Sequence, residues 1–134
     1  MKYPVDGLSK DGNCGVTALA CLAETTVAEM FTHVQNKYGR RGNWKGSMYL
    51  NQLLETFAEF GVVLEEVYWK REGYSTPTLK TLVEKHLGSG TYVVFTTNHF
   101  QVVHNRVVYD QSGGKKAAEH WGARKHVKGV WRVK

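Results

Sequence analysis

The sequence has few cysteines and no long apolar run. Its two cysteines, Cys14 and Cys21, are seven positions apart in a chain of 134 residues. On one helix this spacing separates them by about 10 Å along the axis, which excludes a disulfide between them. The sequence also has no Cys-x-x-Cys pair and no His/Cys cluster with zinc spacing, so we expect no structural metal and no cofactor.

Other absences concern membranes and domain organisation. No apolar run approaches the length of about 18 residues that a membrane-spanning helix needs, and the N-terminus lacks the pattern of a signal peptide. We therefore expect a cytoplasmic protein that does not engage a membrane. The sequence has no internal repeats, and its composition of 42% hydrophobic and 22% charged residues is that of a globular protein. The length predicts a single domain over residues 1–134.

The stretch from Asp11 to Gly15 combines a glycine-containing turn with a cysteine. The small and apolar residues that follow, Val16–Ala23, favour a helix, so Cys14 is predicted in the first helical turn. Backbone N–H groups at a helix start have no intrahelical partner, and the helix dipole adds about half a positive charge there. Both effects lower the pKa of a thiol, and the thiolate is the nucleophilic form. Cys14 is therefore a candidate nucleophile; the alternative is a small hydrophobic residue packed at the helix start.

A second stretch, from Asn98 to Asp110, supplies a candidate base. Two β-rich runs flank His104-Asn105, which predicts a β-hairpin with a two-residue turn at that point. Counting outward from this turn pairs His99 with Asp110, and directly opposed residues point to the same face of a sheet. The carboxylate can then accept a hydrogen bond from one imidazole nitrogen while the other nitrogen faces a thiol. This is the arrangement in which a base activates a nucleophile and a third group orients the base.

The order of these motifs resembles the papain-like cysteine peptidase superfamily. The run Asp11-Gly12-Asn13-Cys14 is similar to the nucleophile loop of ovarian-tumour-type deubiquitinases, and the His99-Phe100…Asp110 hairpin is similar to that of compact bacteriocin-processing peptidases. The resemblance covers residues 8 to 112, approximately. It implies a papain-like α+β fold in which Cys14 is the nucleophile, His99 is the general base and Asp110 orients the base.

The residues before Cys14 depart from one papain-like pattern. Several families carry an oxyanion-hole glutamine six residues before the cysteine, and this position is Leu8 here. The ovarian-tumour-type resemblance implies an oxyanion hole made by backbone N–H groups from Asp11 to Cys14, with help from the Asn13 side chain. Since loss of one such donor costs about 10²–10³ in rate, efficient hydrolysis depends on this loop. Three further residues are candidates for substrate contact: Gly12, Trp44 and Asn98.

The remaining histidines and the second cysteine receive other interpretations. His104 is the rival base, but its odd offset from His99 along the strand puts it on the opposite face. Four histidines among polar or charged neighbours are interpreted as surface or helix-end residues: His33, His86, His120 and His126. Cys21, two turns after Cys14, is expected in the buried core.

Positive charge exceeds negative charge, with 18 Lys and Arg against 12 Asp and Glu and a net charge of +6. One basic group, Arg40, Arg41 and Lys45, lies around Trp44 and several glycines. A second group occupies the C-terminal third: Lys115, Lys116, Arg124, Lys125, Lys128, Arg132 and Lys134. Basic residues interleaved with aromatic residues can bind nucleic acid through phosphate contacts and stacking. They can equally receive an acidic protein partner or serve only solubility.

Hydrophobic periodicity and turn residues predict helices first and strands afterwards. After the helix that starts near Cys14, we predict three helices: Val27–Tyr38, Ser47–Phe60 and Pro77–Leu87. The predicted strands are Val62–Trp69, a central Tyr92–Thr97, the hairpin up to Asp110, and Val127–Val133. Residues 111–114 are predicted as a turn, and residues 115–121 as a short basic helix or a loop. This order predicts the α+β class, with N-terminal helices packed on an antiparallel sheet.

The leading hypothesis is a cysteine peptidase-like hydrolase that cleaves a peptide or isopeptide bond in a protein or peptide substrate through a thioester. An acyl transferase or a transglutaminase would use the same three residues. The alternative, motivated by Leu8 and the basic surface, is a papain-like scaffold, of viral or phage origin, that binds nucleic acid or a host protein. A hydrolase predicts a highly reactive Cys14 beside an inert Cys21, whereas a binding scaffold predicts two sluggish thiols and strongly salt-dependent association.

Overall fold

The structure is a computed structural model that describes residues 1–9, 13–69, 73 and 75–134. Its helices are α1 (Cys14–Ala23), α2 (Val27–Lys37), α3 (Leu50–Glu59), the short α4 (Leu79–Thr81), the π-helix η1 (Leu82–His86) and the 3₁₀-helix η2 (Ala117–Glu119). The strands are β1 (Leu64–Trp69), β2 (Thr91–Thr96), β3 (His99–His104), β4 (Val107–Asp110), β5 (Gly113–Lys116) and β6 (Val127–Val133).

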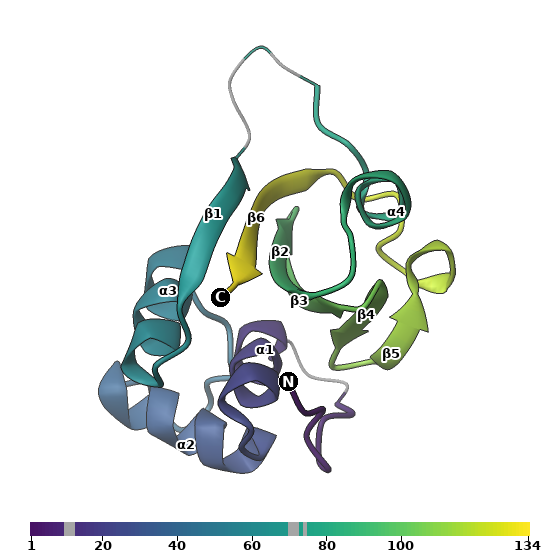
Figure 1. Ribbon diagram of the computed structural model, residues 1–134. Helices are drawn as coiled ribbons and strands as arrows, with labels where there is room; N and C mark the ends of the chain where they lie inside the picture. Colours follow the sequence, from purple (N-terminus) through teal and green to yellow (C-terminus); the bar gives the residue numbers. More distant parts are fainter. Residues whose placement is uncertain (10–12, 70–72, 74) are drawn as a thin grey trace.

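The six strands form one antiparallel sheet in the order β1-β6-β2-β3-β4-β5. The last strand, β6, lies between β1 and β2, so residues far apart in the sequence are paired at this side of the sheet. Figure 1 shows α1, α2 and α3 together at one end of the molecule, with the curved sheet and α4 beyond them. The α+β class and the interior position of the strand that begins near Tyr92 are confirmed.

Apolar side chains form two buried clusters because successive strand residues point to opposite faces. Val93 and Val102 belong to the cluster that α1, α2 and α3 cover, together with Leu19, Leu53 and Phe57. Their neighbours Val94 and Val103 belong to the other cluster, beneath α4 and η1, together with Leu79, Leu82, Val108, Val127 and Val130. Cys21 is fully buried in the first cluster, which confirms its expected place in the core.

Local hydrogen bonds explain where the helices begin and end. Thr26 caps α2, since its Oγ1 accepts from the N–H of Glu29 at 3.1 Å, and Asp6 accepts from the N–H groups of Val27 and Ala28. The helix predicted from Ser47 begins later, at Leu50, after Tyr49 as the cap residue. The predicted helix over residues 77–87 is divided between α4 and η1.

The turn between β3 and β4 lies one residue later in the sequence than predicted. Asn105 and Arg106 are the turn residues, with φ angles of +49° and +69°, and His104 pairs with Val107. Asn105 is held at this position by Gly90, which donates to its Oδ1 and accepts from its N–H. The pairing is therefore shifted by two residues from the prediction. A shift of two preserves the face to which each side chain points, so His99 and Asp110 still share a face.

The segment predicted as a turn after Asp110 contains the start of a strand. Gly113 has a φ of +95° and pairs with Asp110 as the first residue of β5. This edge strand has no periodic apolar residues, so the sequence pattern does not indicate it.

Candidate active site

Cys14 is the first residue of α1, as the sequence predicts. The helix start is fixed by the segment before α3, because Gly46 lies against Asn13 so closely that a Cβ on Gly46 would come within 2.8 Å of the Asn13 Cβ. Gly46 also has a φ of +102°, a conformation that favours glycine. Met48, in the same segment before α3, packs against Gly15 of α1. These contacts hold the thiol at the N-terminus of α1, where α1 meets β3.

The Cys14 thiol is hydrogen-bonded to the His99 imidazole. Burial raises the pKa of the thiol, but the hydrogen bond from His99, its charge and the N–H groups of Phe100 and Gly15 outweigh burial and lower the pKa overall. Burial likewise lowers the pKa of His99, but its hydrogen bonds with Asp110 and Cys14 outweigh burial and raise that pKa. Both shifts favour a thiolate–imidazolium pair.

His99 and Asp110 lie at adjacent strand ends, because His99 begins β3 and Asp110 ends β4. The His99 Nε2 is 2.9 Å from the Asp110 Oδ2, and both residues are buried. Since Nε2 faces the carboxylate, Nδ1 is the ring nitrogen left to face Cys14. The structure thus brings the three predicted residues into one chain of contacts, Cys14 to His99 to Asp110.

His120 is a site residue that the sequence interpretation missed. The sequence predicts a surface or helix-end histidine at this position, but His120 is buried and its Nε2 lies 2.6 Å from the Asp110 Oδ2. Its Nδ1 accepts a hydrogen bond from the N–H of Gly122 at 2.9 Å. A nitrogen that accepts from a backbone N–H carries no proton, so Nε2 carries it and donates to Asp110. His120 follows η2, in a segment with no apolar periodicity, and no local signal indicates this position.

The other carboxylate oxygen of Asp110, Oδ1, also accepts hydrogen bonds. Ser112 donates to Oδ1 from its N–H at 2.8 Å and from its hydroxyl. Burial raises the pKa of Asp110, but the hydrogen bonds from His120, His99 and Ser112 outweigh burial and hold the pKa well below its usual range. Asp110 is therefore an ionised carboxylate with both oxygens held by donors. Tyr3 donates to the Asp110 backbone carbonyl at 2.7 Å and attaches the N-terminal segment to the same strand end.

Trp121 is a second residue that the sequence interpretation missed. Its ring packs edge-on against His99, with centroids 4.6 Å apart, and stacks on His120 at 5.2 Å. Its side chain nevertheless remains 54% exposed. The Lys125 Nζ lies over the ring at 4.7 Å and donates to the Thr97 carbonyl. Trp121 therefore shields the two imidazoles and presents an aromatic surface to solvent beside His99.

The other predicted site residues occupy different environments. Asp11 and Gly12 lie outside the described residues. Asn13 is buried, and its Oδ1 accepts from the Thr17 hydroxyl at 3.5 Å. Asn98 is an exposed turn residue with a φ of +56°, directly before His99. Trp44 is half-buried against Phe31, and its Nε1 donates to the Ser47 carbonyl.

The group His99, Asp110 and His120 has the composition of a metal site, and its candidate ligand atoms lie within 4.8 Å of one another. The hydrogen bond from Gly122 argues against this use, because it leaves the proton on the His120 Nε2, the atom that would have to bind the metal. Both Nε2–O distances are those of hydrogen bonds to a shared carboxylate oxygen. The arrangement is therefore that of a hydrogen-bond network centred on Asp110.

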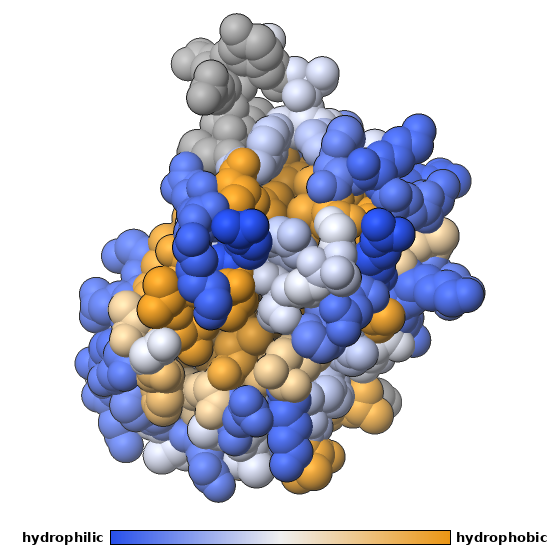
Figure 2. Space-filling model, in the orientation of Figure 1, coloured by the Kyte–Doolittle hydropathy of each residue, from blue (hydrophilic) through white to orange (hydrophobic). Residues whose placement is uncertain are grey.

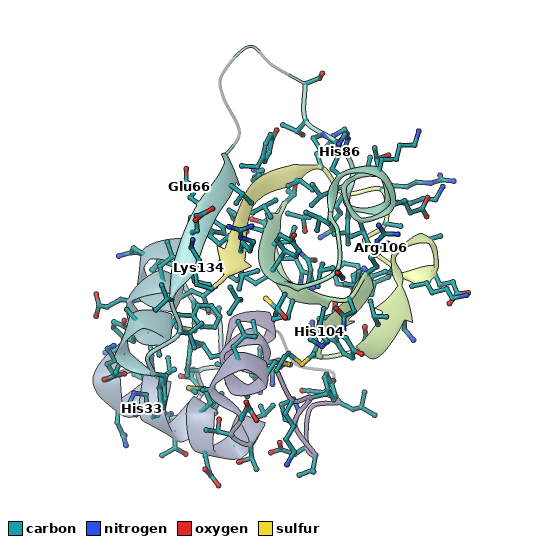
Figure 3. The ribbon with its side chains drawn as sticks, viewed as in Figure 1. His33, Glu66, His86, His104, Arg106 and Lys134 are labelled. Carbon is teal, nitrogen blue, oxygen red and sulfur yellow. The ribbon has the colours of Figure 1, made fainter. Side chains whose placement is uncertain are left out.

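The remaining histidines lie away from this network. His104, the rival base, is hydrogen-bonded to Thr91 at the other end of β3. His33 lies on α2 (Figure 3), where its Nε2 is 2.6 Å from Glu59. His86 and His126 are exposed, which confirms that interpretation for these two residues.

Several of the basic residues have partners within the chain. Arg40 donates to Gln52 and lies over the rings of Trp44 and Tyr49. Arg132 and Lys134 both pair with Glu65. Arg41 and Lys45 are exposed, and their side chains form no ion pair or hydrogen bond with the part of the chain that the structure describes.

Comparison with known proteins adds no assignment to this geometry. No family model and no curated protein matches the sequence. Within the described ranges, no single helix is long and apolar enough to cross a membrane, although α1 and α2 meet the length and composition criterion together as a pair bent by 113°.

Proposed function

We propose that the protein is a papain-like cysteine hydrolase that cleaves a peptide or isopeptide bond. The observation that carries the proposal is the continuous chain of contacts from the Cys14 thiol through the His99 imidazole to the ionised Asp110. This arrangement supplies a nucleophile, a base that can become an acid, and a group that orients the base.

The reaction follows from the placement of the protons. The Cys14 thiolate attacks the carbonyl carbon, and the carbonyl electrons move to oxygen to form a tetrahedral oxyanion. When the C–N bond breaks, the His99 imidazolium gives its Nδ1 proton to the leaving nitrogen, and a thioester remains on Cys14. Neutral His99 then takes a proton from water while the water oxygen attacks the thioester carbon. The C–S bond breaks, which releases the carboxylic acid as the second product and restores the Cys14 thiolate.

The thioester provides the direct test. We expect mass spectrometry of wild-type protein, quenched in acid during turnover of a mixed peptide library, to show acyl adducts on the peptide that contains Cys14. Hydroxylamine should remove them, and Cys14→Ala should form none. Cys21 is the internal control, since burial raises the pKa of its thiol to about 12. Acyl adducts that accumulate on Cys21, or no adduct on either cysteine across peptide and isopeptide substrates, would refute the proposal.

An acyl transferase would form the same thioester and would differ only in the acceptor. Addition of a primary amine during turnover separates the two activities, because a transferase yields the amide of that amine as its main product. We expect the free acid to predominate at millimolar amine concentrations. The binding alternative would instead depend on exposed cations such as Arg41 and Lys45, and its association with nucleic acid would weaken steeply with salt.

In this proposal His120 is a positioning residue, because it touches Asp110 and not the reacting atoms. We expect His120→Leu, which removes the donor to Oδ2, to lower kcat by about 10- to 10²-fold with little change in KM. The His99 imidazolium then becomes the only imidazole donor on Oδ2, so the pKa of His99 should rise. His120→Gln keeps an N–H and should restore most of the activity and the His99 titration.

The pH profile of kcat and the NMR titration of His99 test the positioning role of His120. The charged and titratable groups around His99 and Asp110 in the described chain are Cys14 and Cys21 on α1, Tyr3 before it, and His120 and Lys125 after β5. A solely structural His120 would leave both readouts unchanged in the folded fraction of His120→Leu, and that result would contradict the assignment.

A further inference from the structure

A cavity of about 450 Å³ lies between the sheet and the α4–η1 segment, and it shares no residue with the Cys14 site. Figure 2 shows apolar surface gathered between β1 and α4, with polar side chains around it. The cavity is lined by side chains of β1, β2 and β6 and by the segment from Pro77 to Leu87. Its volume is within the range of small-molecule sites, about 300–1,000 Å³.

The first irregularity at this cavity is in β1. The pairing of β1 with β6 shifts between Glu66 and Tyr68, so Val67 is an extra residue without a partner in the register. In a regular strand, consecutive residues point to opposite faces. Here both Val67 and Tyr68 line the cavity, because the bulge turns two neighbouring side chains toward it.

The second irregularity is in the helix on the other side of the cavity. Leu82–His86 is a π-helix, and the N–H of Leu87 donates to the carbonyl of Leu82 at 3.0 Å. Such wide turns are rare and are found frequently at functional sites. Three residues of this turn line the cavity: Leu82, His86 and Leu87. Figure 3 shows His86 beside α4. Two separate departures from regular structure therefore supply side chains to one cavity.

The polar groups of the cavity are mainly hydrogen-bond donors. Arg132 lines it and shares Glu65 with Lys134, so two cations face one carboxylate at this side of the sheet. His86, Tyr68 and Tyr92 also line the cavity, and the hydroxyls of the two tyrosines form no hydrogen bond with the described residues. An apolar cavity with a guanidinium and unpaired donors is complementary to an apolar molecule that carries an anionic acceptor.

We propose that this cavity is a binding site for a small organic carboxylate with an apolar body. The apolar body contacts Val67, Leu82 and Val130, and the carboxylate binds at Arg132. Binding at this site does not depend on the reaction proposed for Cys14.

Decanoate, below its micelle concentration, is the probe for this proposal, and decanol is the uncharged control. We expect methyl NMR spectra to show saturable shifts at Val67, Leu82 and Val130 with decanoate, and binding of decanol that is about tenfold weaker. Arg132→Gln should weaken decanoate binding about tenfold and leave decanol binding unchanged. Arg124→Gln is the matched control, because it removes an exposed cation that neither lines the cavity nor pairs with Glu65.

A second variant keeps the test valid if Arg132→Gln impairs folding. Val67 is 45% exposed, so Val67→Glu should fold normally, and its carboxylate should abolish decanoate binding by repulsion. Three results would overturn the proposal: no saturable shift at the lining residues, equal affinity for decanoate and decanol, or full decanoate binding by folded Val67→Glu. Binding of a peptide with an apolar C-terminal residue, without binding of decanoate, would also overturn it in favour of a peptide site.

Discussion

Cys14 is expected to be alkylated by iodoacetamide well below the pH at which an ordinary thiol reacts, while Cys21 stays unreacted. The hydrogen bond and charge of His99 lower the pKa of Cys14 against the effect of burial, so the thiolate is populated at a lower pH than in an ordinary cysteine. Burial raises the pKa of Cys21 to about 12, and Cys21 is also inaccessible. The rate of Cys14 alkylation between pH 5 and 9 is the measurement.

Removal of His99 should have a large effect on that rate. In His99→Ala the burial of Cys14 remains while the main opposing interaction is lost, so the thiol pKa rises above its ordinary value. Since an opposite charge at contact distance shifts a pKa by about 1–3 units, the rate at pH 7 should fall by about 10- to 10³-fold. His104→Ala is the matched control, because His104 lies on the same strand and is hydrogen-bonded to Thr91. Equal profiles for wild type, His99→Ala and His104→Ala would remove the basis of the catalytic proposal.

Asp110→Asn is expected to lower both kcat and stability. The substitution replaces one carboxylate oxygen by an NH₂ group, so either the two imidazole N–H groups or the two Ser112 donors lose their acceptor. His99 also loses the charge that stabilises its imidazolium. We expect kcat to fall by about 10²–10⁴-fold, the range typical of a positioned acid–base group. The free energy of unfolding at pH 7 should fall by about 3–5 kcal/mol, because buried hydrogen-bonded charges lose their partner.

The stability effect of Asp110 should depend on pH in a defined direction. The hydrogen-bond donors around Asp110 hold its pKa in the folded protein well below the ordinary value of an aspartate, despite burial. Its stabilising contribution is therefore complete well above pH 4, and it declines as the pH falls below about 4, where the unfolded chain takes up the proton. Denaturant unfolding of wild type and Asp110→Asn at pH 7 and pH 3 measures this. A difference in stability that stays constant between the two pH values would contradict the ionised, buried Asp110.

The roles of Cys14, His99 and Asp110 in the site were predictable because they depend on short-range sequence patterns. Cys14 at a helix start follows from a turn and the apolar residues after it. The common face of His99 and Asp110 follows from the two-residue period of strands. This prediction therefore holds although the predicted register is wrong by two residues. An error of one residue would have separated them, because it reverses the face of every side chain. The position of the turn itself was decided by Gly90, through hydrogen bonds that no local pattern indicates.

The sequence by itself determined the α+β class, the helix that begins at Cys14 and the strand character of the residues around His99, since these follow from periodicity and turn residues along a few neighbouring positions. Only the tertiary structure decided that His120 and Trp121 join the site and that β6 lies between β1 and β2. It also decided that the bulge in β1 faces the π-helix η1. These features join segments distant in the sequence, and their contacts depend on how the whole sheet curves. Local periodicity carries no information about them.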